Sequence, residues 1–226
     1  MRVFKEKDFK MQATANNSQF LMIVDQETKK LQQAVRNSGF IYRLITGQAR
    51  ALEYARYLFN QYFLFRTLEI ALEEHWSHPM VEPIYTPELY RQEALEHDMS
   101  VLMGSGWRTL RPLRATEVYE KRISRLADEY PEYLGAHAYT MYFARLKRSR
   151  SLYQIMNHVY GLQDKALNFY RYRLIDNMPE FINSYQKAFD SLPLNQNKRY
   201  QYLGEINMSY MCNMAISLEL NNSLTN

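Results

Sequence analysis

Buried-type side chains recur every three or four residues along most of this chain, a spacing typical of helices that pack one face against a core. The first clear example is the stripe of Leu21, Val24, Thr28, Leu31 and Val35. No segment of useful length alternates apolar and polar residues, as a half-buried strand would. The pattern therefore predicts an all-α fold and excludes a sheet as its framework.

Turn-forming residues divide this pattern into about eight helices. After the first helix, which should end at the turn 37–39, we expect helices over about 41–45, 49–74, 87–103, 116–130, 135–160, 179–192 and 196–220. The polar residues 1–18 predict a flexible N-terminal arm. Residues 19–226 are expected to form one helical domain, because no Gly/Ser-rich linker or internal repeat divides them.

Composition excludes several classes of protein. The 226 residues include 19 Tyr, 11 Phe and 2 Trp, which provide too much apolar surface for a disordered chain. The single cysteine, Cys212, excludes an internal disulfide framework and a cysteine-rich metal site. A formal net charge of +4 is too small to indicate a nucleic-acid partner.

The chain also lacks the signals of membrane insertion or secretion. No apolar run approaches the roughly 20 residues that cross a bilayer. The longest candidate near the start, residues 20–24, is too short for the core of a signal peptide. We therefore expect a cytoplasmic protein without a membrane span.

Common catalytic motifs, such as a Gly-rich phosphate loop, His-Glu-x-x-His or Gly-x-Ser-x-Gly, are absent. The most specific patterns are Glu-Pro-Ile-Tyr-Thr-Pro-Glu-Leu-Tyr-Arg at 82–91, Ala-Leu-Glu-His-Asp at 94–98, Leu-Gly-Ala-His-Ala-Tyr-Thr-Met-Tyr-Phe at 134–143 and Met-Ser-Tyr-Met-Cys-Asn at 208–213. In order and spacing these segments resemble the heme oxygenase family, over about residues 21–220. The resemblance implies a helical domain that holds heme between a proximal and a distal helix and opens it to biliverdin, carbon monoxide and iron.

The resemblance further implies an axial histidine on the first helix, four residues after a threonine. In this chain Thr28 is followed at that distance by Gln32, and no histidine precedes His75. An amide oxygen is a far weaker ligand for heme iron than an imidazole. We therefore expect the usual iron ligand to be missing.

A Gly-Asp-Leu-Ser-Gly-Gly run on the distal helix is also implied, with glycines that admit the heme face and an aspartate that orders water. The matching run at 144–149 is Ala-Arg-Leu-Lys-Arg-Ser, so the glycines are gone and Arg145 replaces the aspartate. Only glycine, without a Cβ, allows such a close approach. We expect a straighter and more regular helix here, with Lys147 and Arg148 filling the space or swinging out.

The family's heme propionates bind basic residues, whose matching positions here are Asp25, Ile182 and Gln186, none of them basic. Of their neighbours, Lys29 and Lys187 could substitute. The full set of pocket positions that the resemblance assigns is Gln32, Thr28, Tyr139, Ala144, Arg145, Arg148 and Tyr210. The two tyrosines of this set are expected to join a hydrogen-bonded cluster, because buried tyrosine hydroxyls usually find partners.

Arg145, Lys147, Arg148 and Arg150 form a basic cluster in the same segment. At helical spacing Arg145 and Arg148 share a face. The cluster predicts either a solvated surface or a site for an anionic ligand or an acidic protein partner. A tetrapyrrole with carboxylates would fit if Arg148 pointed into the old cavity.

We interpret the chain as a degenerate heme-oxygenase-like protein that acts in binding or interaction and is not an enzyme, with no cofactor and no metal site assigned. Two alternatives stay open. One is an active heme oxygenase that ligates heme unusually, through His137 or His158. The other is a di-metal oxidase on the same scaffold, for which Glu93 and His97 have ligand spacing and Glu69 is a further carboxylate.

Overall fold

The structure, a computed structural model, describes residues 20–225, so the predicted arm at 1–18 lies outside the described residues. Its helices are α2 (Phe20–Arg36), α3 (Gly39–Ile45), α4 (Ala51–Glu74), α5 (Gln92–Met103), α6 (Arg114–Glu129), α7 (Leu134–Ala138), α8 (Ala144–Leu146), α9 (Ser149–His158), α10 (Met178–Asp190) and α11 (Gln196–Thr225). No strand occurs within these residues. The predicted all-α class is confirmed.

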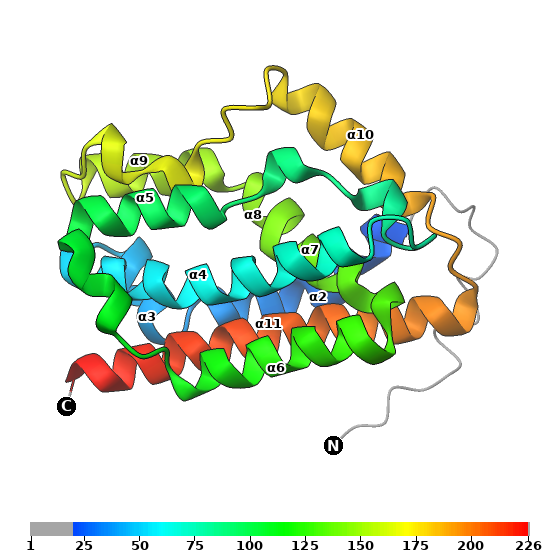
Figure 1. Cartoon of the computed structure of the whole chain (residues 1–226), viewed down its shortest axis with the longest axis horizontal. Coiled ribbons are helices and arrows are strands. Elements are labelled where there is room, and N and C mark those ends of the chain that lie inside the picture. The colour runs from blue at the N-terminus through cyan, green and yellow to red at the C-terminus, as the bar shows by residue number, and fades with distance from the viewer. Residues whose placement is uncertain (1–19, 226) are drawn as a thin grey trace.

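Helix α4 occupies the centre of the domain. Figure 1 shows it between α5 on one side and the neighbouring pair α6 and α11 on the other, and α4 packs against α5 and α6 more extensively than against any other helix. Tyr54, Leu58, Phe65 and Leu68, which recur at helical spacing, are buried, but so is Leu64 between them. A helix that buries residues on several sides is enclosed by the fold, and α4 therefore forms the core of the domain.

The α2–α3 turn fixes both helices against α11. Gly39 has a φ of 55°, a conformation that favours glycine, and a Cβ on it would lie 2.6 Å from the Ser217 carbonyl oxygen of α11. The Ser217 hydroxyl accepts the Ile41 N–H at 3.0 Å and donates to the Ser38 carbonyl at 3.2 Å. The helix stop predicted at 37–39 is therefore also a docking point.

The expectation of a straighter, regular helix over 135–160 is wrong. α7 continues into a π-helical segment, Tyr139–Phe143, and a turn at residues 147–148 separates α8 from α9. Side chains compete for backbone carbonyls along this path: the Thr140 hydroxyl donates to His137 O and the Arg145 Nε to Met141 O. Such bonds bend helices without any glycine, and residues 136–160 are bent although they contain none.

A buried polar network joins α6, α7 and α11. The Tyr119 hydroxyl lies 2.9 Å from His137 Nδ1 and also contacts the Ser209 hydroxyl of α11. His137 Nε2 lies 3.4 Å from a Glu205 carboxylate oxygen, and Glu205 pairs with Arg122 of α6. Burial lowers the pKa of His137, although Glu205 opposes the shift. His137 is therefore a neutral structural group at pH 7.

No helix within residues 20–225 combines the length and the apolar character that a bilayer-crossing helix requires.

Substituting Gly39 tests the close approach to α11. We expect Gly39→Ala to lower the free energy of unfolding by about 2 kcal/mol or more, because the added methyl meets α11 backbone and the backbone conformation disfavours alanine. The matched control is Gly204→Ala on the exposed face of α11, where nothing lies within 4 Å. That change should raise stability by about 0.5–1 kcal/mol. Urea unfolding measures both, and an unaffected Gly39→Ala protein would contradict the close approach.

Acid should destabilise the folded protein through His137. Its pKa in the folded state lies below the ordinary value of about 6.5, so below that pH the unfolded chain binds the extra proton and the free energy of unfolding falls. One such group contributes at most about 1.4 kcal/mol per pH unit. Removing it by His137→Asn should therefore flatten the loss of stability on going from pH 7.5 to 5.5.

The comparison of His137→Asn with wild type isolates this one group. Glu69, whose pKa burial raises to about 7, contributes with the opposite sign over the same range but is present in both proteins. Parallel pH profiles for the two proteins, measured by urea unfolding, would show that His137 is not held neutral by the fold.

Candidate functional site

A cavity of about 280 Å³ lies between α2, α3, the α8–α9 turn and α11. Its wall is mostly aliphatic near α3 and α9 and polar near α8, where Arg145 and Arg148 line it, as does Arg36 at the end of α2. Five of the seven predicted pocket residues meet here, namely Gln32, Ala144, Arg145, Arg148 and Tyr210. The cavity therefore has an apolar half and a positively charged half.

The other two predicted pocket residues do not line this cavity. Thr28 is completely buried beneath Gln32, where its hydroxyl donates to the Val24 carbonyl. Tyr139 donates its hydroxyl to Asp25 at 2.7 Å and packs edge-on against Phe189 of α10. Two of the predicted pocket residues therefore lie outside the cavity wall. Thr28 contacts the wall through its hydrogen bond with Gln32.

Arg145 projects from α8 toward α4. Its guanidinium donates to the Tyr57 hydroxyl at 3.1 Å and to the Gln61 side-chain oxygen at 2.9 Å, and lies over the rings of Phe65 and Phe169. No carboxylate of residues 20–225 lies within 4 Å of it. Burial lowers the pKa of Arg145, but the surrounding tyrosines raise it above its ordinary value. The side chain is therefore a permanent cation held by neutral groups.

Both ends of the Gln32 amide are engaged. Its Nε2 donates to the Thr28 hydroxyl at 2.9 Å, and its Oε1 accepts from Arg148 Nη2 at 2.8 Å. The second bond joins α2 to the α8–α9 turn, and both of its residues line the cavity. The amide oxygen is therefore directed at a guanidinium.

The prediction that Tyr139 and Tyr210 both join a hydrogen-bonded cluster is correct for only one of them. Tyr139 has a hydrogen-bond partner in Asp25, whereas the buried hydroxyl of Tyr210 has no partner among the described residues. Tyr210 lines the cavity from α11. Burial raises its pKa, so it stays a neutral phenol that can both donate and accept. Tyr210, with an unpaired hydroxyl, therefore lines the same cavity as Arg145 and Arg148.

The predicted basic cluster does not form one surface. Arg145 and Arg148 face the cavity, as their spacing predicts, but Lys147 pairs with Asp25 at 3.5 Å and Arg150 is exposed to solvent. The bend at 147–148 separates the two pairs. Only the cavity-facing pair forms a common site.

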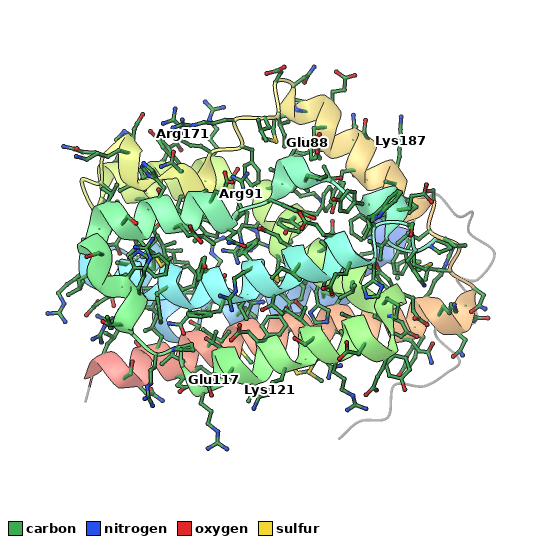
Figure 2. The ribbon with its side chains drawn as sticks, in the orientation of Figure 1. Glu88, Arg91, Glu117, Lys121, Arg171 and Lys187 are labelled. Atoms are coloured by element: carbon green, nitrogen blue, oxygen red, sulfur yellow. The ribbon has the colours of Figure 1, made fainter. Side chains whose placement is uncertain are left out.

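The substitutes considered for the propionate-binding positions do not face the cavity. Lys187 projects outward from α10 in Figure 2. Lys29 is exposed on α2. The positive charge of the cavity therefore comes from its arginines alone.

The candidate metal ligands lie apart. Within residues 20–225 no three His, Cys, Asp or Glu side chains gather as a metal ion would require. Glu69 accepts the backbone N–H groups of Arg91 and Gln92, His97 is exposed beside Asn168, and His158 binds its own helix. The di-metal alternative therefore gains no support from this arrangement.

Sequence reasoning missed several residues of the cavity wall, notably Tyr57, Thr140 and Asn213. A signal existed for the first of these. Tyr57 and Gln61 are four residues apart on α4 and so share a face, where two polar groups indicate a polar contact. Thr140 and Asn213 gave no comparable signal.

Comparison with known proteins gives a consistent result over most of the chain. The family model described as "Heme oxygenase" matches residues 18–219. Heme oxygenase 1 of Synechocystis is 31% identical over 198 residues, which cover 87% of this chain and 82% of that protein, and a heme oxygenase of Porphyra purpurea is 31% identical over 199 residues, 87% of this chain and 84% of that protein.

Solved structures agree with these matches. The crystal structure of heme oxygenase-1 from Synechocystis in complex with heme has a TM-score of 0.87 at 30% identity, covering 93% of this chain and 95% of that one. The heme oxygenase of Leptospira interrogans has a TM-score of 0.85 at 29% identity, covering 88% of this chain and 98% of that one.

Proposed function

The chain belongs to the heme oxygenase family, and we propose that it is a binding protein on that scaffold which does not hold heme iron through a histidine and does not cleave heme. The observation that carries the proposal is the Gln32–Arg148 hydrogen bond. It joins the position matching the axial ligand to the position matching a distal glycine, so the amide oxygen of Gln32 is already engaged by a guanidinium.

The cavity wall does not fit an iron-ligating site. Heme proteins use histidine, cysteine, methionine or tyrosinate as axial ligands, and the residues of 20–225 that line the wall include no histidine, cysteine or methionine. It does contain Tyr57, Tyr170 and Tyr210. Burial raises the pKa of Tyr170 and Tyr210, which keeps both as phenols at neutral pH, and the Tyr57 hydroxyl accepts from Arg145. The residues present therefore offer no strong ligand.

The distal side does not fit the family's chemistry either. A carboxylate that orders water is replaced by Arg145, a cation that donates hydrogen bonds and cannot accept them. The positions of the distal glycines hold Ala144, Arg148 and Ser149, and Arg148 lines the cavity and donates to Gln32. At about 280 Å³ the space also lies at the lower limit of the roughly 300–1,000 Å³ typical of ligand sites.

The rival function is an active heme oxygenase with an unusual ligand. It is favoured by the family match across most of the chain and by the similarity to a structure solved in complex with heme. Of the two histidines considered for that role, His137 is buried in the α6–α7–α11 network and His158 is exposed beyond the cavity wall. Either histidine would have to leave its present contacts in order to reach heme.

A heme titration decides between these functions. We expect the purified protein to give a weak, broad and non-saturating Soret absorbance and no bilin after addition of ascorbate, because no strong ligand faces the cavity. The Gln32→His variant should restore little of this binding, since Arg145 and Arg148 still occupy the distal side. A heme oxygenase from Synechocystis treated in parallel is the positive control.

Two results would contradict the proposal. Saturable heme binding followed by conversion to a bilin in the unmodified protein would establish the rival. Tight heme binding by Gln32→His alone would show that the distal side is open. Arg150→His, which adds a histidine outside the cavity, is the matched control for nonspecific heme adsorption.

A further inference from the structure

We propose that the cavity binds a small organic acid, with its carboxylate on Arg145 and its apolar body against α3 and α9. This inference deepens the proposed function and rests on it, because it assigns the ligand class of the cavity that would otherwise receive heme. The ligand is defined by chemistry: one carboxylate joined to a short hydrocarbon chain.

Arg145 is a charge without a counter-ion. A guanidinium has five N–H donors, and Met141 O, Tyr57 and Gln61 each accept one hydrogen bond from it. All three acceptors are neutral. Arginines that have structural roles nearby are paired with carboxylates, Arg122 with Glu205 and Arg43 with Glu53. An enclosed charge is costly unless it is paired. A bound carboxylate would supply the counter-ion that Arg145 lacks.

Arg91 also has no carboxylate partner for its guanidinium among residues 20–225. Its side chain is buried and donates to three backbone carbonyls, and it stacks on Tyr172. Figure 2 places Arg91 beside the start of α5, and it does not line the cavity. Arg145 differs because it lines a cavity large enough to admit an anion.

A second polar residue lines the same cavity. The Tyr210 hydroxyl is buried and has no hydrogen-bond partner in residues 20–225, although buried hydroxyls normally have one. Tyr210 lines the cavity from α11, on a different helix from Arg145. The wall therefore contains a hydroxyl without a partner in addition to a cation without a counter-ion.

The rest of the wall fits a hydrocarbon chain. The apolar side is formed by Val35, Ile41, Leu44, Ile45, Leu152 and Ile155. Arg36 and Arg148, both exposed, lie at the cavity wall and make its surroundings positive, which favours the approach of an anion. The separation of a charged end from an aliphatic end is the pattern of a monocarboxylate with an apolar tail, and the volume favours a short one.

The test uses decanoate, with decanol as the same chain without the charge. Isothermal titration calorimetry should show saturable binding of decanoate to the full-length protein and markedly weaker binding of decanol. Arg145→Met should weaken decanoate binding by about tenfold or more, the range expected on losing charge-assisted hydrogen bonds. It should leave decanol binding within about twofold, because the hydrocarbon contacts remain. Arg150→Met is the matched control, since it removes a nearby exposed charge.

A second variant covers the case in which Arg145→Met does not fold. Ala144 lines the cavity and makes none of the Arg145 hydrogen bonds. Ala144→Leu fills the space and should abolish decanoate binding while the far-ultraviolet circular dichroism stays that of the wild type. Decanoate affinity unchanged by either variant, or equal affinity for decanol and decanoate, would overturn the proposal.

Further outcomes of these binding experiments distinguish a failure of this inference from a failure of the proposed function. Absence of decanoate binding in a protein that also fails to bind or cleave heme would overturn the ligand class and leave the proposed function standing. Heme cleavage by the unmodified protein would overturn the proposed function itself. Biliverdin supplies the same carboxylate chemistry on a larger body, and stronger Arg145-dependent binding of biliverdin than of decanoate would overturn the short-chain assignment.

Discussion

The burial of α4 on several sides is the constraint on which the remaining helices depend. Because residues such as Leu58, Leu64 and Leu68 all lie out of contact with solvent, α5, α6, α7 and α11 must each cover part of this one helix. The same burial fixes the direction of the polar residues that α4 does contain. Tyr57 and Gln61 can point only toward α8, and there they determine where the guanidinium of Arg145 lies.

Packing in the core therefore determines the geometry of the site. Arg145 is oriented by hydrogen bonds to α4 and by the rings of Phe65 and Phe169, all of which are held by packing. The orientation of Arg148 depends on a single bond to Gln32, and that bond is exposed. The two arginines of the cavity thus differ in rigidity: one is fixed by the core and the other can move at modest cost. A ligand would therefore bind next to Arg145, whose position is fixed, and Arg148 could adjust its position to the ligand.

Much of the fold was predictable because helical periodicity is local. The stripe from Leu21 to Val35, the stop at 37–39 and the long helix α4 follow from neighbours in the sequence. The bend in the distal segment was not predictable in this way, because it depends on Thr140, which contacts Ser209 some seventy residues later. The Gln32–Arg148 bond likewise joins residues 116 positions apart. Each position could be identified from the family resemblance, but the contact between them could not.

The π-helical segment at Tyr139–Phe143 links the path of the chain to the site. Its path is secured by the Thr140 hydroxyl, which donates to the His137 carbonyl and contacts Ser209 of α11. Thr140 also lines the cavity, together with Ala144 and Arg145 that follow it. A substitution at Thr140 would therefore change the bend of the helix and the wall of the cavity at the same time.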